Sequence, residues 1–321
     1  MDEPFSASEV GKAIQRLSNG KSGGLGKIPA ECLKKATRLV DDKEVNVMVG
    51  PLRALFEHIR SMNDFPVQFE VAALSPLHKK GDVGVMGNYR GLAVGSVLAK
   101  LYAFLLENRL SSWGEGNGVR SHYRGGFHKN RGTVHNIFVL RHMLDRHCKG
   151  SRASPPLYIC QIDFEKAFDR VPRHLLWMRL EERGVGAKAL ESIKAGYEKA
   201  VLMLKVNGIK GDPFESVQGV KQGCPLSPTL YGIFGEGFVD LVDALDKHIP
   251  AYMSVDTSPM VDGIRIPLLL YADDLTLFAQ SRIRMERLLE VLSKWCEAFG
   301  MRVNVKKTEV LEVSPTPEIR R

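Results

Sequence analysis

Residues 267–280 read PLLLYADDLTLFAQ and place two adjacent carboxylates, Asp273 and Asp274, between two apolar runs. Short apolar runs bounded by turn residues are typical of buried strands, so the stretch predicts a tight hairpin of two core strands with the aspartates at its turn. One interpretation is an acidic surface turn. The other is a metal site, because hard divalent cations bind carboxylate oxygens and offset the cost of placing two charges at the end of a core hairpin. A metal site needs a third carboxylate from elsewhere in the chain.

The composition is that of an ordinary globular protein, with 321 residues of which 44% are hydrophobic and 26% are charged. The sequence has no run of about 18 apolar residues that could span a bilayer and no apolar secretory segment near its start, so we expect no membrane partner. The five cysteines are odd in number and lack the spacing of a disulfide framework or a zinc site. This cysteine usage favours a reducing, intracellular compartment such as the nucleus or the cytoplasm.

The net charge of +8 favours a polyanionic partner, although a basic surface can also serve solubility alone. Much of the excess lies in short basic clusters, which we expect to line a cleft for that partner. The residues expected to line it are Lys79 and Lys80, which follow His78, then His128, Lys129 and Arg131, and finally Lys306 and Lys307.

Turn signals and apolar periodicity divide the chain into unevenly alternating helices and strands. Ser6 or Ser8 can cap a helix at 6–17, and apolar residues at helical spacing from Leu288 to Phe299 predict an amphipathic helix that ends at Gly300. This alternation favours an α+β fold, an antiparallel sheet with helices on one face. Further helices are expected at 44–60, 96–110, 175–184, 187–200 and 227–245, and strands at 67–77, 157–164, 201–208 and 301–313.

Asp163 is the candidate third carboxylate. It ends the apolar strand LYICQI at 157–162, so its side chain can emerge at the same sheet edge as the aspartates of the hairpin. Asp169 follows, and a helix cap or salt bridge explains it better than a ligand role. Between the two acidic stretches lies VKQGCPLSPTLYGIF at 220–234, in which Gln222 and Gly223 open a loop and two prolines lead into a helix.

In this order, the three stretches resemble the reverse transcriptase domain of non-LTR, LINE-like retrotransposons. The palm of that family carries an Asp at a strand end, a Gln-Gly loop and a Tyr-Ala-Asp-Asp hairpin. The resemblance covers nearly the whole chain. The stretch KKGDVGVMGNYRGLAV at 79–94 resembles a fingers motif, RGGFHKNRGTVHNIFVLR at 124–141 resembles the segment Q-x-G-F-R…T, and NVKKTEVLEV at 304–313 matches a segment with N-x-x-K-T.

The resemblance implies a right-hand polymerase fold. It implies an N-terminal helical extension at 1–65, fingers at 66–155 to which part of 185–218 returns, and a palm at 156–321. Only fourteen residues follow Lys307, so we expect the thumb to be missing or truncated and the chain to be a fragment or a pared-down copy. An endonuclease domain and a zinc-knuckle region are not recognisable. The chain also departs from the family pattern in the fingers: Gly26 stands at its Asp, Gly91 at its Pro and Arg124 at its Gln.

The resemblance further implies two-metal transfer of a deoxynucleotide to a primer 3′-hydroxyl, with Mg²⁺ or Mn²⁺ as the two ions. Asp163 and Asp273 would bridge the metals, the backbone carbonyl of Phe164 would add a ligand, and Asp274 would hold the site or the primer end. Lys307 would donate a proton to pyrophosphate or neutralise template phosphate. The expected partners are an RNA template, a DNA primer and dNTP.

Nucleotide binding is assigned by the same resemblance. Phe168 would exclude the ribose 2′-hydroxyl, and the alternative is an ordinary buried core phenylalanine. Three cationic side chains would hold the triphosphate, and a glutamine and a glycine would pack against the nucleotide. These residues are Lys79, Lys80 and Arg90, with Gln222 and Gly223. Either lysine could instead be a solvated loop charge.

Other functions remain open at this point. A catalytically silent nucleic-acid-binding remnant would keep the fold and lose the chemistry. A relative of group II intron maturases would share the palm but needs a thumb region that is not recognisable here. An RNA-dependent RNA polymerase is disfavoured by Phe168.

Overall fold

The computed structural model describes residues 1–314 except 129, 149–154, 248–257 and 262. The chain divides into two compact units, which are described separately. Unit 1 comprises Met1–Gly116 and Leu176–Leu230, and unit 2 comprises Asn117–Leu175 and Tyr231–Arg321. Within the described residues, every helix is too short or too polar to span a bilayer.

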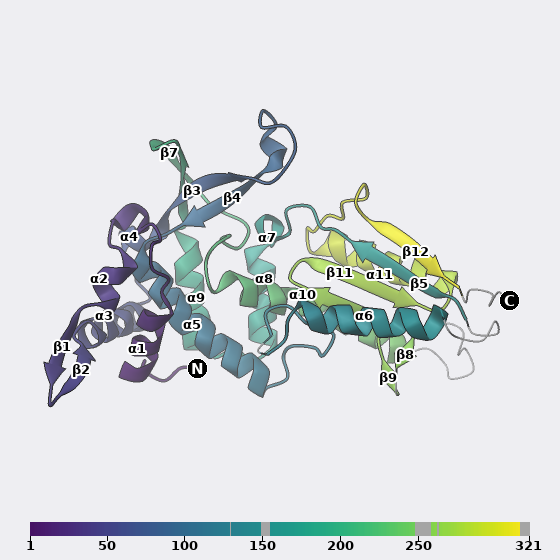
Figure 1. Cartoon of the computed structure of the whole chain (residues 1–321), viewed down its shortest axis with the longest axis horizontal. Coiled ribbons are helices and arrows are strands. Elements are labelled where there is room, and N and C mark those ends of the chain that lie inside the picture. The colour runs from purple at the N-terminus through teal and green to yellow at the C-terminus, as the bar shows by residue number, and fades with distance from the viewer. Residues whose placement is uncertain (129, 149–154, 248–257, 262, 315–321) are drawn as a thin grey trace, which may run out of the picture. The chain divides into compact units, whose positions relative to one another are not determined.

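Unit 2 is built on a four-stranded antiparallel sheet with the strand order β10-β11-β5-β12 (Figure 1). The predicted hairpin is confirmed: Leu268 pairs with Leu277, and Tyr271 pairs with Asp274 at its tip. The apolar side chains of both hairpin strands are buried, which is why this run of sequence predicts core strands so well. The four strands are β5 (Leu157–Ile162), β10 (Leu268–Tyr271), β11 (Asp274–Ala279) and β12 (Glu309–Val313).

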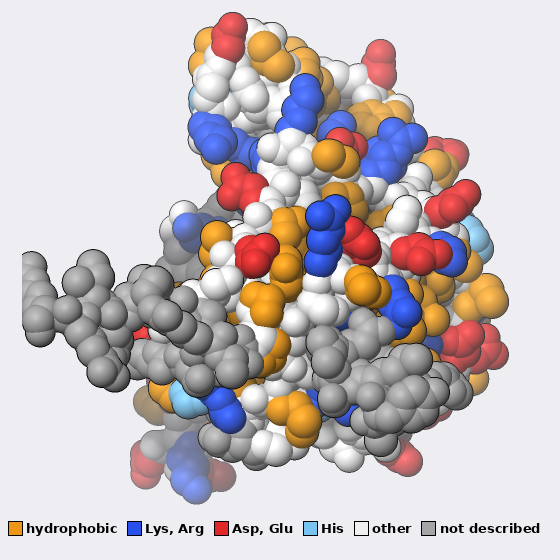
Figure 2. All heavy atoms as spheres, turned by 90° about the vertical axis from the view of Figure 1, so that its right-hand side faces the viewer, with side chains coloured by type: hydrophobic (Ala, Val, Ile, Leu, Met, Phe, Trp, Pro, Cys, Tyr) orange, Lys and Arg blue, Asp and Glu red, His pale blue; other side chains and the backbone are white. Residues whose placement is uncertain are grey.

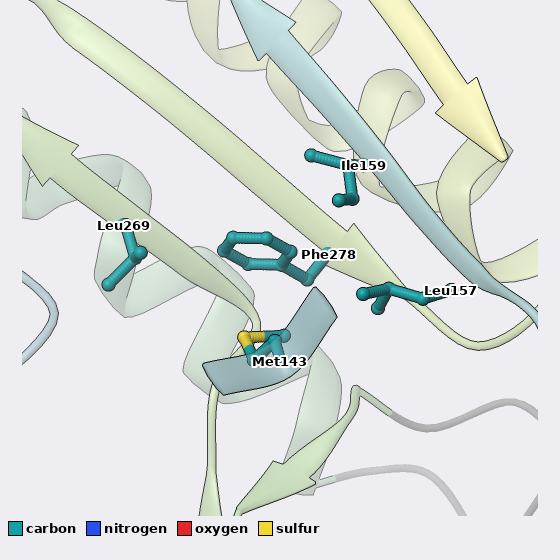
Figure 3. Packing of buried hydrophobic residues seen from close by; sticks show 5 residues of the cluster. All are labelled: Met143, Leu157, Ile159, Leu269 and Phe278. Atoms are coloured by element: carbon teal, nitrogen blue, oxygen red, sulfur yellow. The ribbon is translucent and has the colours of Figure 1, made fainter. Parts of the chain in front are cut away.

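One face of this sheet packs against helix α6 (Thr133–Cys148). Met143 of α6 contacts a buried cluster made by Leu157 and Ile159 of β5, Leu269 of β10 and Phe278 of β11 (Figure 3). Burial of a cluster of this size removes a large apolar area from water and is the main force that holds α6 on the sheet.

The opposite face of the sheet is covered by α11 (Arg282–Ala298), which contacts β11 and β5. Because side chains alternate along a strand, Cys160 and Leu277 point to this second face. The expectation of helices on a single face is therefore wrong. Helix α6 was not predicted from the sequence. Its apolar residues Val134, Ile137 and Phe138 are exposed, so apolar side chains are not confined to the face that packs on the sheet.

The predicted amphipathic helix near residue 290 is confirmed as α11. Ser281 caps it by accepting a hydrogen bond from the backbone N–H of Arg284, and Leu288, Leu292 and Trp295 are buried. Trp295 also contacts Phe234 of α10. Unit 2 further contains α7 (Ala167–Arg170), β8 (Met260–Val261) and β9 (Ile264–Arg265), while α8 (Arg173–Glu182) and α10 (Ser227–Lys247) each cross a boundary between the units.

Unit 1 contains a second four-stranded sheet, with the order β4-β3-β6-β7. Strands β3 and β6 are parallel, and the other two pairs are antiparallel. The strands are β3 (Val71–His78), β4 (Tyr89–Val94), β6 (Val201–Val206) and β7 (Ile209–Glu215). A short 3₁₀ helix, η1 (Gly24–Gly26), contacts β3, and a second one, η2 (Met86–Asn88), lies in the loop between β3 and β4.

The helices of unit 1 include the predicted N-terminal helix, α1 (Ala7–Arg16), which begins with a complete capping box formed by Ser6 and Glu9. Helix α5 (Val97–Gly116) is buried over most of its length, and its Tyr102 meets Phe5, Phe56 and Phe65 in an aromatic cluster. The remaining helices are α2 (Ala30–Lys34), α3 (Val49–Met62), α4 (Val67–Glu70) and α9 (Ala187–Glu198).

Three expected elements differ from the structure. The expected helix at 44–60 is α3, preceded by an exposed hairpin of β1 (Thr37–Val40) and β2 (Lys43–Asn46). The expected strand at 67–77 begins with the short helix α4, and the strand expected at 301–313 begins only at Glu309. Residues 302–304 pair with the chain just beyond β5, and a turn in which the backbone N–H groups of Lys307 and Thr308 donate to the Asn304 carbonyl separates them from β12.

Candidate functional site

The three predicted carboxylates of unit 2 lie at one edge of its sheet. Leu275 of β11 pairs with Ile162 of β5. Because the two strands are antiparallel, Asp274, which precedes Leu275, lies opposite Asp163, which follows Ile162. Asp273 occupies the hairpin turn beside Asp274. We call Asp163, Asp273 and Asp274 the carboxylate edge. The structure thus brings together the residues that the resemblance assigns to catalysis.

Charge accumulates at the carboxylate edge. Although Asp274 reaches solvent at the turn, its pKa is raised above the ordinary value, first by desolvation and then by the negative charges of Asp273 and Asp163. Like charges held this closely favour a proton or a bound cation, because either one relieves the repulsion. The arrangement is therefore suited to binding positive charge.

Asp163 is held by the loop that follows α11. Its backbone carbonyl accepts a hydrogen bond from the Asn304 backbone N–H at 2.7 Å, and its Oδ2 accepts one from the Asn304 side-chain amide at 3.0 Å. The hydroxyl of Thr308 lies 3.5 Å from the Asp163 backbone N–H and donates to the Asn304 carbonyl. Lys307 pairs with Asp163 Oδ2 at 3.4 Å. The motif N-x-x-K-T therefore holds Asp163 through all three of its named residues.

The donors at the carboxylate edge are carboxylate oxygens, the type of ligand that binds Mg²⁺. No three His, Cys, Asp or Glu side chains of the described residues converge closely enough to hold a metal ion together. A cation here would use one or two carboxylates and complete its shell with phosphate oxygens and water, which is the coordination that Mg²⁺ favours. Phe164, the predicted backbone ligand, forms an isolated bridge with Val303, and its ring contacts Trp295.

Phe168 stacks on Tyr231 of α10, with ring centroids 4.8 Å apart and an angle of 10° between the planes. Phe168 is half-buried, whereas Tyr231 is buried. Burial raises the pKa of the Tyr231 hydroxyl, and the charge of Asp273 adds to that rise. Tyr231 thus both stacks on Phe168 and feels the charge of Asp273, a role that was not predicted from the sequence.

The predicted phosphate-binding cations lie in unit 1, around one end of the β3–β4 hairpin. Lys79 and Lys80 follow β3 directly and are exposed, and Arg90 of β4 is exposed opposite Leu77. The Lys79 backbone N–H donates to the Asn88 carbonyl at 2.8 Å, which closes the loop between the strands. The structure therefore gathers these three cations on one hairpin.

The Gln-Gly loop of unit 1 packs on the same β4 strand. The Gln222 carbonyl accepts a hydrogen bond from the Ala93 backbone N–H at 2.9 Å. Gly223 has a φ of +99°, and a Cβ there would lie 3.0 Å from Leu92 Cδ1. A glycine is required at this position both by the left-handed backbone and by the close approach to β4.

The remaining predicted basic residues lie in unit 2. On the face that Figure 2 shows, lysine and arginine side chains are interspersed with acidic and hydrophobic ones. His128, Arg131 and Lys306 belong to unit 2, and Arg131 donates to the His122 carbonyl at 2.7 Å. Lys129 lies outside the described residues. A single basic cleft stays a prediction.

Comparison with known proteins identifies the family. Residues 77–317 match the family described as "Reverse transcriptase (RNA-dependent DNA polymerase)". The chain is similar to the Xenopus laevis "Transposon TX1 uncharacterized 149 kDa protein", with 28% identity over 97% of this chain and 22% of the relative. It is also similar to the Drosophila melanogaster "Probable RNA-directed DNA polymerase from transposon BS", with 26% identity over 95% of this chain and 32% of the relative.

A third relative is the Drosophila melanogaster "Retrovirus-related Pol polyprotein from type-2 retrotransposable element R2DM", with 25% identity over 72% of this chain and 20% of the relative. The chain thus spans between a fifth and a third of the length of these relatives.

Solved structures share the fold. The apo telomerase of Candida tropicalis truncated from its C-terminal domain matches with a TM-score of 0.55 and 15% identity, over 87% of this chain and 58% of that chain. The family match covers the carboxylate edge, the Gln-Gly loop and the N-x-x-K-T segment together. The chain belongs to the reverse transcriptase (RNA-dependent DNA polymerase) family, in its non-LTR retrotransposon branch.

Proposed function

We propose that this chain is a polymerase domain that adds deoxynucleotides to a primer 3′-hydroxyl under the direction of an RNA template. The observation that carries the proposal is the carboxylate edge, where Asp163, Asp273 and Asp274 share one end of the β5–β11 ladder. In this assignment the sheet of unit 2 is the palm, and the β3–β4 hairpin of unit 1 belongs to the fingers.

The carboxylates of unit 2 have separate duties in this proposal. Asp163 and Asp273 bind one or two Mg²⁺ or Mn²⁺ ions, with the Phe164 carbonyl as a further ligand, and Asp274 maintains the negative charge of the edge. Bound cations supply charge stabilisation at the attacking 3′-oxygen and at the leaving pyrophosphate. The Nζ of Lys307 lies 3.4 Å from Asp163 Oδ2, which supports a role as the proton donor to pyrophosphate.

Nucleotide-binding roles are proposed within each unit separately. Lys79, Lys80 and Arg90 bind the triphosphate, because exposed cations gathered on one hairpin suit a polyanion and a guanidinium binds phosphate in a bidentate manner. Gln222 and Gly223 contact the nucleotide through a loop that is fixed on β4. Phe168 excludes the ribose 2′-hydroxyl, and its half-buried ring supports that role better than a fully buried ring would.

Primer extension on an RNA template tests the proposal, with the purified chain and with dNTP and NTP supplied separately. We expect Mg²⁺-dependent extension with dNTP, which Asp163→Asn and Asp273→Asn abolish while the circular dichroism spectrum stays unchanged. Asp145→Asn is the matched control, because Asp145 pairs with Arg141 of the same helix at the surface of unit 2. Tight primer–template binding without any extension would contradict the proposal and support a silent nucleic-acid-binding remnant.

A further inference from the structure

The hairpin that carries Asp273 has an additional neighbour in unit 2, the segment Tyr123–Gly126, which we call the strap. The Leu270 backbone N–H donates to the Tyr123 carbonyl at 3.0 Å, and the Gly125 backbone N–H donates to the Leu270 carbonyl at 2.8 Å. Arg124 therefore forms a parallel bridge with Leu270. Since β10 is the edge strand of its sheet, the strap pairs with its outer side, where the Asn136 side-chain amide also donates to the Leu270 carbonyl.

The strap also contacts the turn itself. Ala272, the residue before Asp273, has a φ of +55°, a backbone conformation that an alanine adopts only when its surroundings impose it. A Cβ at Gly126 would collide with the Ala272 backbone nitrogen, so the strap lies directly against this turn. Contact with the strap is therefore part of what holds Ala272, and with it Asp273, in place.

A buried ion pair anchors the strap. Arg124 Nε donates to Glu236 Oε1 at 2.6 Å, and the two side chains are 1% and 2% exposed. The second oxygen, Oε2, accepts a hydrogen bond from the Ser121 backbone N–H at 3.1 Å. The Glu236 carboxylate of α10 thus bonds both to Arg124 in the strap and to Ser121 just before it.

The surface of α10 is shaped for this arginine. A Cβ at Gly235 would lie 3.0 Å from Arg124 Nη2, and one at Gly232 would lie 3.9 Å from Arg124 Nε. The guanidinium therefore passes over two helical glycines to reach Glu236. This chain has Arg124 where the family pattern has Gln, so a longer, charged side chain is accommodated together with a buried acid.

We propose that Arg124 and Glu236 are positioning residues for the Asp273 turn: their ion pair holds the strap on β10 and so keeps Ala272 and Asp273 in one arrangement. The inference rests on the proposed function, because only there does the placement of Asp273 affect catalysis. A buried ion pair adds little net stability compared with apolar replacements, and its use as a device that selects one arrangement is the better-attested role.

The test replaces both members of the pair. Arg124→Met together with Glu236→Met removes both charges and leaves no unpaired ion to unfold the core. The matched control is Arg284→Met together with Asp246→Met, which removes another buried ion pair of unit 2 between α11 and the same helix α10. Both members of this control pair hydrogen-bond to Ser258.

Two readouts are measured on the full chain. In hydrogen–deuterium exchange without metal or nucleotide, the peptide 268–276 should exchange at least about 10-fold faster in the Arg124/Glu236 double variant and at the wild-type rate in the control. In single-nucleotide kinetics, the Mg²⁺ concentration for half-maximal rate should rise about 10-fold or more in the same double variant only, as for residues that orient ligands.

The outcomes separate the two proposals. Unchanged exchange in 268–276, or equal acceleration in both double variants, would overturn the positioning role whatever the activity. A chain that extends no primer even as wild type would overturn the proposed function, while faster exchange confined to 268–276 would still support the link between the ion pair and the turn.

Discussion

Asn304 contacts Asp163 with both its backbone and its side chain: the backbone N–H donates to the Asp163 carbonyl at 2.7 Å, and the amide nitrogen donates to Oδ2 at 3.0 Å. The backbone bond fixes the position of Asp163, and the side-chain bond orients its carboxylate. A carboxylate that already accepts a hydrogen bond has fewer rotamers to lose when it binds a ligand. Asn304 is therefore expected to affect catalysis more than folding.

Asn304→Ala should lower the rate of nucleotide addition by about 10-fold to 100-fold, the usual effect of removing a group that orients a ligand residue. The backbone hydrogen bond persists in this variant, so the melting temperature should change little. Single-turnover kinetics and thermal melts measure the two effects. Asn108→Ala on α5 is the control, and an equal loss of rate there would argue against orientation as the cause.

Removal of the Phe168 ring should relax sugar selectivity. Phe168→Ala should raise the ratio of ribonucleotide to deoxynucleotide incorporation by about 10-fold or more, the order of discrimination that a shaped pocket provides. Tyr231→Ala should do the same to a smaller extent because it removes the ring on which Phe168 stacks, whereas Tyr231→Phe keeps that ring and should not. Incorporation kinetics with each nucleotide give the ratio. Unchanged selectivity in Phe168→Ala would contradict the steric role and indicate that Phe168 only packs in the core.

Gly223→Ala should destabilise the chain more than Gly20→Ala. Both glycines have positive φ, but a Cβ at Gly223 would press on Leu92 and Ala93, whereas a Cβ at Gly20 would meet no atom within 4 Å. We expect a loss of about 1 kcal/mol at Gly20 from backbone strain alone and a larger loss at Gly223. Urea unfolding gives both values, and the Michaelis constant for dNTP should rise only in Gly223→Ala.

The Glu9 carboxylate should make stability depend on pH in an acidic window. Its hydrogen bond with Arg109 is the main cause that lowers the pKa of Glu9 from 4.5 to about 2, and Ser6 contributes to the same shift. A lowered folded-state pKa means that the stabilisation is complete above pH 4.5 and disappears as the pH falls to about 2. Since the Glu9 side chain stays partly exposed, solvent screening should keep the benefit below about 1 kcal/mol.

Glu9→Gln tests this window by urea unfolding at several pH values. Wild type should be the more stable protein at neutral pH, and the two unfolding free energies should converge near pH 2. A difference that persists at the lowest pH would point to packing of the side chain instead of its charge.

Charge reversal at Lys79 and Lys80 should weaken primer–template binding for all sequences alike. With each lost contact between a lysine and a phosphate, protein binding releases fewer counterions from the nucleic acid. The slope of log affinity against log salt should therefore become shallower by about one per lost contact. Fluorescence anisotropy over a salt series measures the slope. Lys294→Glu is the control because Lys294 pairs with Glu290 on the exposed face of α11, and an equal effect there would indicate only a change in net charge.

Local patterns in the sequence determined the elements that surround the carboxylate edge. The apolar runs on both sides of Asp273 predict the hairpin, the apolar strand before Asp163 predicts its place at a strand end, and Ser6 with Glu9 predicts the first helix. Each of these inferences depends on residues within a few positions of one another, so backbone geometry and periodicity suffice. The family resemblance extended them to a function because it depends on the order of motifs along the chain.

Only the tertiary structure decided which distant residues hold those elements in place. Arg124 reaches Glu236 across 112 positions, and Asn304 reaches Asp163 across 141, and no periodicity relates residues so far apart. Helix α6 was missed because apolar residues are also exposed on it, which hides its buried side in the sequence pattern. The sequence by itself thus determined which residues could carry the chemistry, whereas long-range packing and buried hydrogen bonds decided how they are held.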